Sequence, residues 1–352
     1  MDSNGDSERP VRRTPSAGWL DRLRGRPVAS ARPRREPPAH VAVVTDSAAA
    51  VPPEWAAAHA DRLRVVPMPV MIDGQIYTEG LDDVETELAL ALAMGKTVQT
   101  SRPAPGLFAR SYRELAEAGA THIVSIHISG RLSGTVDAAR LAGADGPVPV
   151  TVIDTQTVAL AQGFAVMDAV AAAEAGAGPE EVAGAAAHAA DHLICFAVPS
   201  LEQLRRGGRI TTAASMIGTL LAVKPILGIA DGQVVVKDKV RTLPKALARL
   251  VDLARSAAAD RHDGARMAVQ YFGNRAQALE LVHELAGSAH GDVWCVSLPA
   301  VLAAHTGAGV LAVAVDAPSR PRTPEHTGPS PAVQGDETTG SGPSEPSDTD
   351  RS

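Results

Sequence analysis

Short apolar runs alternate with longer amphipathic stretches in the first half of this sequence. The run Val41–Val44 is continuously apolar, as expected for a strand that is buried on both faces. Strands that alternate with helices favour a mainly parallel sheet with helices on both faces. We therefore expect an N-terminal α/β domain over residues 39–190. Its other strands are expected at 63–72, 75–77, 121–128 and 148–153, and its helices at 52–61, 84–94, 105–118, 162–174 and 179–190, with one more opening at Ser133.

The pattern changes in the second half of the chain. Two apolar segments, 224–229 and 233–237, flank Asp231-Gly232, a dipeptide that favours a hairpin turn. An antiparallel hairpin beside strands that alternate with helices predicts a mixed sheet. We therefore expect a C-terminal α/β domain over residues 191–317. Its other strands are expected at 192–198, 267–272, 292–297 and 310–315, and its helices at 243–258 and 274–287.

Both ends of the chain lack apolar periodicity. Residues 1–38 hold nine Arg and five acidic residues, whereas residues 318–352 hold three Arg and six acidic residues. Segments of this composition bury too little apolar surface to offset the entropy lost on ordering. We predict a disordered basic tail over 1–38 and a disordered acidic tail over 318–352.

Composition argues against several classes of partner. The formal net charge is -7, and the chain has only three Trp, three Tyr and four Phe. Nucleic-acid surfaces need a basic footprint or exposed rings, so nucleic acid is not an expected partner. Cys195 and Cys295 lie in apolar runs and are expected to pack as small core residues. No run approaches the ~18 apolar residues of a membrane span and no export signal is present, so we expect a cytoplasmic protein that is not integral to a membrane.

Candidate chemistry lies where predicted strands end, the place at which ligands gather in open parallel sheets. Thr45-Asp46-Ser47, Ser129 to Thr135, and Asp154-Thr155 all bring hydroxyl or carboxylate groups to such ends. In the second segment a strand leads through small residues directly into a helix. Ser133 and the free N–H groups there favour an anion, although spacing alone favours the simpler reading in which Ser133 only caps its helix.

Four residues elsewhere in the sequence are open to a structural or a functional reading. Ser101 is suited to cap the helix that follows it, whereas Thr100 is placed to donate its hydroxyl to the same anion. Arg209 follows paired glycines and is either an anion clamp or a surface charge. His305 lies in a glycine-rich turn, where a lone histidine is more often structural than catalytic.

Common enzyme motifs are not found in this sequence. It has neither a Walker phosphate loop nor a G-x-G-x-x-G after the first strand. The nearest approach to a hydrolase elbow is Gly130 to Gly134, with the serine one place late. His, Cys and carboxylates do not cluster at metal-ligand spacing. We expect neither a metal nor a cofactor.

Eight segments in order nevertheless resemble the DegV family, the bacterial fatty-acid-binding proteins. Each is weak alone, but together they run from His40 to about Asp316 and leave only the tails outside. They are Val43–Ser47, Thr100–Pro103, Ser125–Thr135, Val152–Thr155, Leu204–Ile210, Lys224–Ile226, Arg241-Thr242 and Ala304–Gly309.

The resemblance implies a two-domain α/β fold that holds a long-chain fatty acid in a cleft between the domains. It also implies that the bound carboxylate is presented to a partner fatty-acid kinase, which phosphorylates it for phospholipid synthesis, while the carrier itself does no chemistry. Thr100 and Ser133 match the residues that hydrogen-bond the carboxylate. The surrounding cleft network would comprise Thr45, Asp46, Ser101, Gly134, Arg209 and His305, and an apolar tunnel would comprise Met216, Ile217, Leu220, Leu221, Ile226 and Leu227.

Two positions depart from the family pattern. Arg131 stands where the family has glycine, which would obstruct the turn if this position needs a positive φ. Arg102 stands where the family has glutamine and adds charge near the mouth of the cleft. Two other functions remain open: an acyl-ester hydrolase that uses Ser133, and a lipid-sensing regulatory protein.

Overall fold

The computed structural model describes residues 40–80, 82–210, 223–259 and 264–316. These residues belong to one compact unit. The two tails that the sequence predicts as disordered lie outside the described residues, as do Met216, Ile217, Leu220 and Leu221 of the predicted tunnel. No helix in the described ranges combines the length and the apolar character that crossing a membrane requires.

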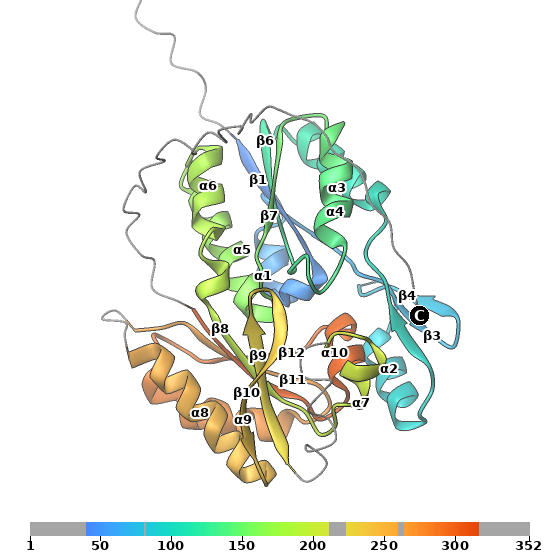
Figure 1. The fold of residues 1–352 in the computed structure, drawn as a ribbon. Coiled ribbons are helices and arrows are strands. Elements are labelled where there is room, and N and C mark those ends of the chain that lie inside the picture. The colour runs from blue at the N-terminus through green and yellow to red at the C-terminus, as the bar shows by residue number, and fades with distance from the viewer. Residues whose placement is uncertain (1–39, 81, 211–222, 260–263, 317–352) are drawn as a thin grey trace, which may run out of the picture. The chain divides into compact units, whose positions relative to one another are not determined.

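The first sheet is parallel and has the strand order β2-β1-β6-β7. Alternate residues of the central strands face opposite layers: Val41 and Val43 pack against α5 and α6, whereas Ala42 and Val44 pack against α3 and α4 (Figure 1). The predicted α/β layering is therefore confirmed. The strands are β1 (Val41–Asp46), β2 (Leu63–Val66), β6 (His122–His127) and β7 (Val150–Asp154), and the helices are α1 (Pro53–Ala58), α3 (Pro105–Glu117), α4 (Thr135–Ala144), α5 (Ala159–Glu174) and α6 (Pro179–Ala186).

A small antiparallel sheet, β4-β3-β5, projects from the first one. The prediction of a single strand over 63–72 was wrong. Pro67 and Pro69 separate β2 from β3, because proline cannot donate to a strand ladder, and the two strands join different sheets. Its elements are β3 (Val70–Ile72), β4 (Gln75–Tyr77), β5 (Val98–Thr100) and the helix α2 (Val84–Ala93), which packs against it.

The second large sheet is mixed, with the order β10-β9-β8-β13-β11-β12. All its neighbouring pairs are antiparallel except β11 and β12. One face packs against α8 and α9. The strands are β8 (Leu193–Ala197), β9 (Lys224–Ala230), β10 (Gln233–Val240), β11 (Met267–Tyr271), β12 (Trp294–Ser297) and β13 (Leu311–Val315), and the helices are α7 (Glu202–Arg206), α8 (Leu243–Ala259), α9 (Arg275–Leu285) and α10 (Ala300–Thr306).

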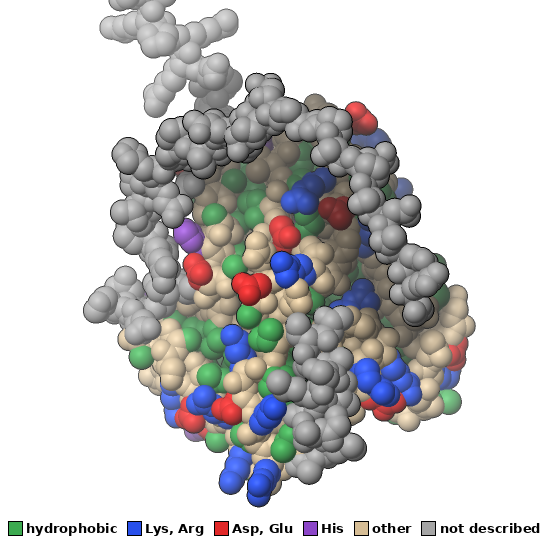
Figure 2. Space-filling model, viewed as in Figure 1, with side chains coloured by type: hydrophobic (Ala, Val, Ile, Leu, Met, Phe, Trp, Pro, Cys, Tyr) green, Lys and Arg blue, Asp and Glu red, His purple; other side chains and the backbone are tan. Residues whose placement is uncertain are grey.

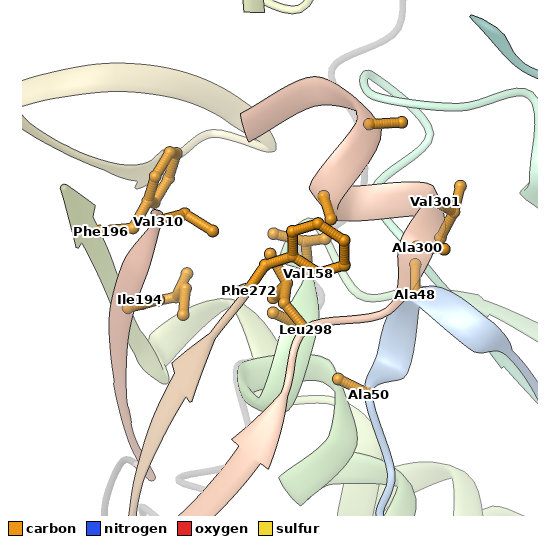
Figure 3. Close-up of a cluster of buried hydrophobic side chains, with 14 of the residues drawn as sticks. Ala48, Ala50, Val158, Ile194, Phe196, Phe272, Leu298, Ala300, Val301 and Val310 are labelled. Atoms are coloured by element: carbon orange, nitrogen blue, oxygen red, sulfur yellow. The ribbon is translucent and has the colours of Figure 1, made fainter. Parts of the chain in front are cut away.

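Helix α5 lies between the two large sheets. Twelve of its sixteen residues are buried, which is the pattern of a helix enclosed on all sides. Leu160 and Phe164 pack in one hydrophobic cluster with Ile194 and Phe196 of β8. The close-up in Figure 3 shows part of this cluster, where Ile194 and Phe196 of β8, with Leu298 after β12 and Val310 before β13, lie opposite Ala48 and Ala50, which follow β1. The predicted boundary at residues 190 and 191 falls between the sheets, and the division into two domains stays a prediction.

The described surface carries both signs of charge. On the face drawn in Figure 2, acidic and basic side chains are interspersed rather than gathered by sign. A mixed surface of this kind produces no strong field of a single sign over that face.

Candidate functional site

A narrow pocket lies between the two large sheets, and we call it the inter-sheet pocket. It encloses about 790 Å³ of atom-free space including its mouth, of which the centre of a water-sized sphere can occupy only about 90 Å³. Most of the space is therefore narrow. Its walls are Met68, Thr100, Ser101, Arg102, Ile128, Leu132, Ser133, Val158, Ala159, Ile194, Phe196, Leu204, Arg209, Ile229, Val234, Leu298, Val301, Leu302, His305, Thr306, Val310 and Ala312.

Most of these walls are apolar. Ile194 and Phe196 contribute from β8, Leu298 from the segment before α10, Val301 from α10 itself, and Val158 from the loop before α5 (Figure 3). All five are less than one-tenth exposed. Since aliphatic and aromatic side chains offer no hydrogen bonds, this part of the pocket suits a hydrocarbon.

Four polar side chains of the pocket come from one strand end, two loops and one helix. Thr100 ends β5, Ser133 precedes α4, Arg209 follows α7, and His305 lies in the last turn of α10. The Thr100 Oγ1 atom lies 2.8 Å from His305 Nε2, which is a hydrogen bond between residues 205 positions apart. The structure therefore brings together four predicted site residues that the chain separates widely.

His305 is neutral at ordinary pH. Burial, and after it the nearby positive charge of Arg209, together lower the pKa of its imidazole to about 4. A neutral ring that carries its proton on Nε2 donates to Thr100 Oγ1. The Thr100 hydroxyl is then free to donate its own proton to an acceptor in the pocket. Arg209 remains the cation of this group, and its Nε donates to the Leu132 carbonyl at 3.2 Å.

Ser133 sits in a tight turn rather than at a helix cap. Its N–H and that of Leu132 both donate to the Ser129 carbonyl, at 3.1 and 2.9 Å. Helix α4 begins at Thr135 with Gly134 as its N-cap, so the prediction that Ser133 opens the helix was wrong by two residues. The Ser133 hydroxyl contacts Thr135 Oγ1 at 2.8 Å and lines the pocket. The reading in which Ser133 merely caps its helix is thus not observed.

Ser101 and Arg102 are exposed and lie at the mouth of the pocket. Helix α3 is capped at Ala104 without a side-chain hydrogen bond, so Ser101 does not cap it. Arg102 passes over Gly134, where an added Cβ would lie 3.2 Å from Arg102 Cδ. Gly134 thus leaves room for this arginine, and its carbonyl accepts a long hydrogen bond of 3.5 Å from it.

Arg131 does not obstruct its turn. It is not among the described residues with positive φ, so the conformation that would demand glycine is absent at this position. The turn is anchored by Ser129, whose hydroxyl donates to the Gly232 carbonyl at 2.7 Å and accepts from the Arg131 N–H at 3.2 Å. The β9–β10 hairpin is thereby fixed against the loop that carries Ser133.

Thr45 and Asp46 are fully buried and lie outside the lining of the pocket. Thr45 donates to the Ile126 carbonyl at 2.7 Å. The Asp46 carboxylate accepts hydrogen bonds from the N–H groups of Ala48 and Ile128, at 3.1 and 3.0 Å, and contacts His127 Nδ1 at 2.9 Å. The structure therefore does not bring these two residues to the pocket, although Asp46 fixes the start of the loop that does reach it.

Several lining residues were not predicted from the sequence. Phe196, Val301 and Val310 sit in ordinary apolar runs, which carry no signal that distinguishes a pocket wall from a core. Ile226 and Leu227 of the predicted tunnel are fully buried but do not line the pocket. Ile226 packs on the face covered by α8 and α9, and the neighbouring Ile229 faces the pocket instead.

Side chains that could hold a metal do not gather in the described part of the chain, where no group of three or more His, Cys, Asp and Glu residues has suitable geometry. The two cysteines are free thiols, and burial raises the pKa of the Cys195 thiol to about 11. Cys195 therefore stays protonated at neutral pH.

Comparison with known proteins gives concordant matches. The family model described as "Uncharacterised protein, DegV family" matches residues 40–317. A DegV domain-containing protein of Streptomyces coelicolor is 42% identical over 281 residues, which are 78% of this chain and 98% of that protein. Among solved structures, a fatty-acid-binding DegV family protein from Thermus thermophilus is 35% identical, with a TM-score of 0.74 over 79% of this chain and 99% of that one. DegV of Bacillus subtilis, described as a fatty acid binding protein, is 29% identical, with a TM-score of 0.71 over 79% of this chain and 99% of that one.

Proposed function

Because the chain belongs to the DegV family, we propose that it binds a long-chain fatty acid in the inter-sheet pocket, with the carboxylate at Thr100 and Ser133. The observation that carries this proposal is the division of one narrow pocket into a polar group at Thr100, Ser133, Arg209 and His305 and an apolar remainder. A fatty acid has the same division. The similar protein from Thermus thermophilus, whose fold covers 79% of this chain, is described as binding a fatty acid.

The polar group suits a carboxylate rather than a neutral head. Two hydroxyls can donate to its oxygens, and Arg209 supplies one positive charge beside a neutral His305. Hydrogen bonds to a charged group contribute about 1.5–3 kcal/mol each.

The acyl chain supplies most of the affinity. Each buried methylene contributes about 0.8 kcal/mol, so a dozen supply on the order of 10 kcal/mol before the cost of immobilising the chain. The apolar walls offer no partner for a polar substituent, and a hydroxylated or dicarboxylic chain should bind more weakly.

We further infer that the protein presents the carboxylate to a partner fatty-acid kinase in the cytoplasm. The carboxylate group lies near exposed Ser101 and Arg102, so the reactive end of the lipid faces the mouth while the chain is enclosed. In the partner reaction a carboxylate oxygen attacks the terminal phosphorus of ATP, a C–O–P linkage forms, and ADP leaves. The carrier contributes no nucleophile, metal or cofactor to this step.

Mass spectrometry of lipids extracted from the purified full-length chain tests the first part. We expect one long-chain fatty acid per protein, and its amount should fall in a Thr100→Ala, Ser133→Ala double variant. Recovery of no fatty acid, together with no binding of added hexadecanoic acid, would contradict the proposal.

The second part is tested by adding ATP with and without a fatty-acid kinase. We expect acyl phosphate to form only when the kinase is present. If lipid is bound but no kinase acts on it, a lipid-sensing role is favoured instead.

A further inference from the structure

A second hollow lies beyond one apolar wall of the inter-sheet pocket, and we call it the outer cleft. It encloses about 1330 Å³ of atom-free space, including the solvent at its open rim. The apolar residues that line it include Ala50, Val51, Pro67, Val296, Leu298 and Ala300. An open cleft with an apolar floor therefore adjoins the enclosed pocket.

Leu298 separates the two spaces. Among the described residues it alone lines both of them, and its side chain is only 5% exposed. In Figure 3, Ile194 and Val310 of the inter-sheet pocket lie on one side of this leucine. Ala50 and Ala300 of the outer cleft lie on the other side. One aliphatic side chain thus closes the pocket against the cleft.

The backbone on either side of this leucine is held by hydrogen bonds. The Leu298 N–H donates to the Tyr271 carbonyl at 2.7 Å. Two residues further on, the Ala300 N–H donates to the Glu79 carboxylate. The segment cannot move aside without losing these bonds, so the volume of the Leu298 side chain decides whether the two spaces connect.

Leu298 and the polar group of the pocket lie at opposite ends of α10. His305 belongs to the last turn of this helix, whereas Leu298 lies two residues before its first residue, Ala300. Since an α-helix rises about 1.5 Å per residue, α10 separates the two by on the order of 10 Å. An acyl chain whose carboxylate is held at Thr100 and Ser133 would therefore extend along α10 toward Leu298.

We propose that Leu298 sets the upper limit of acyl chain length by closing the far end of the inter-sheet pocket. This inference rests on the proposed function, because it concerns the other end of the same fatty acid. A chain that ends before Leu298 is enclosed by apolar side chains. Each further methylene has to displace this leucine or fold back within a narrow pocket, and a densely packed interior makes both costly.

The outer cleft decides which longer chains a widened pocket would accept. A hydrocarbon end that passed position 298 would reach the apolar floor and stay partly shielded from water. A second carboxylate would instead meet an acidic rim. Among the described residues that line the cleft, Glu79, Asp82, Asp83 and Glu85 carry carboxylates and none is Lys or Arg. Because like charges repel, a dicarboxylic acid of equal length gains nothing from the opening.

Competition between chain lengths tests this role in the full-length protein. Delipidated protein is incubated with phosphatidylcholine vesicles that contain equal amounts of hexadecanoic and docosanoic acid, and the fatty acids it takes up are quantified by mass spectrometry. We expect the wild type to take up mainly hexadecanoic acid. Leu298→Ala should raise the ratio of docosanoic to hexadecanoic acid about tenfold, as when about two further methylenes become buried. Docosanedioic acid in place of docosanoic acid should show no such rise.

Two substitutions control for the other effects of a smaller side chain. Leu204→Ala enlarges the inter-sheet pocket at a wall that does not line the outer cleft. Leu88→Ala removes the same atoms from the same hydrophobic cluster, at a residue that lines neither space. Both should leave the ratio of docosanoic to hexadecanoic acid within about two-fold of the wild-type ratio, because neither connects the pocket to the cleft.

A larger side chain gives the opposite test and does not depend on the stability of the smaller variant. Leu298→Phe keeps the core filled and brings the end of the pocket closer to the carboxylate. With vesicles that contain dodecanoic and hexadecanoic acid, it should lower the share of hexadecanoic acid about four-fold, as for the loss of roughly one buried methylene.

The outcomes separate this inference from the proposed function. Ratios that stay unchanged in both Leu298→Ala and Leu298→Phe, while hexadecanoic acid still binds, overturn the role of Leu298 and leave fatty-acid binding intact. An equal rise in Leu204→Ala also overturns it, because added volume anywhere in the pocket would then suffice. Failure of the wild type to take up a fatty acid of any length overturns the proposed function and this inference together.

Discussion

Gly207 lies directly against the imidazole ring of His305, and a Cβ added at residue 207 would overlap the Nδ1 atom of that ring. The φ of Gly207 is -73°, which any residue can adopt, so space and not backbone conformation requires glycine here. The end of α7 therefore fixes the position of a ring on α10, and His305 is held with its Nε2 atom on Thr100.

Gly207→Ala should weaken fatty-acid binding. The added methyl group has to displace the His305 ring, and Thr100 then loses the partner that orients its hydroxyl. We expect a loss of about 1–2 kcal/mol in binding free energy, close to one hydrogen bond to a charged ligand. Titration calorimetry with hexadecanoic acid measures it.

Gly106→Ala is the matched control for that substitution. A Cβ at this position of α3 would meet no atom within 4 Å, so the variant should bind normally and be slightly more stable. A Gly207→Ala protein with full affinity and an unchanged melting temperature would show that the position of His305 is not required for binding.

The hydroxyls of Thr100 and Ser133 can be tested one at a time. Thr100→Val keeps the shape of the side chain and removes its donor, and Ser133→Ala does the same for the other loop. Each should weaken binding of a fatty acid by roughly 1–3 kcal/mol, with a smaller effect on a fatty alcohol of equal length, because only the carboxylate carries charge. Equal losses for acid and alcohol would mean that these hydroxyls shape the pocket without contacting the carboxylate.

The depressed pKa of His305 predicts a dependence of stability on pH. The ring has an ordinary pKa of 6.5 when unfolded and about 4 when folded, so between these values the unfolded chain binds more protons. Stability must therefore rise with pH in this window, and fall on the order of 3 kcal/mol as pH drops from about 6.5 to about 4. Delipidated protein is needed, because a bound carboxylate would raise the pKa of the ring.

Urea unfolding of the wild type and of His305→Gln at pH 4.5 and 7 measures this contribution. The difference between the two proteins should be larger at pH 7 than at pH 4.5, with the variant relatively more stable at low pH. His283→Gln, at an exposed histidine of α9, controls for the removal of one imidazole. Parallel curves for wild type and His305→Gln would show that His305 titrates alike in both states.

The layered fold is readable from the sequence because buried parallel strands leave continuous apolar runs such as Val41–Val44. The errors in the predicted secondary structure have local causes. The run 63–72 resembles one strand because apolar residues lie before Pro67, between the two prolines at Met68, and after Pro69. In the structure, the residues before and after these prolines belong to two different sheets. Helix α10 has seven residues, too short for a helical period to emerge.

The residues of the candidate site could be predicted from the sequence only in part, for a different reason. Thr100 and His305 are joined by a hydrogen bond across 205 positions, and neither local pattern contains that information. Their order along the chain matched a family motif, which is how they were selected. Asp46 was selected in the same way, yet its carboxylate is used inside the protein. A motif identifies residues that a fold requires and does not separate those that hold a ligand from those that hold a loop.

One buried arrangement deserves comparison with a hydrolase. Asp46 Oδ2 lies 2.9 Å from His127 Nδ1, and His127 Nε2 lies 2.6 Å from Ser125 Oγ, which is the order of contacts in a catalytic triad. All three side chains are fully buried, however, and none lines the inter-sheet pocket. Ser125 also contacts the Tyr112 hydroxyl at 2.8 Å. These side chains satisfy one another's hydrogen-bonding groups. We therefore interpret them as a structural network between the first sheet and α3.

The protein should therefore show no multiple-turnover hydrolysis of acyl esters. Ser133, the serine that does line the pocket, contacts Thr135, and His305 is engaged by Thr100 instead. A nucleophilic serine needs a base within about 3 Å that is oriented by a third group, and Ser133 has no such partner among the described side chains. Ser125→Ala should lower stability by about 1–3 kcal/mol, since it leaves buried partners unsatisfied, while Ser133→Ala should lower lipid affinity alone. Release of p-nitrophenol from its hexadecanoate ester, followed for many turnovers, decides the matter. Steady release that disappears in Ser133→Ala would make this protein an enzyme, and release that disappears in Ser125→Ala with the fold intact would mean that the buried triad opens to substrate.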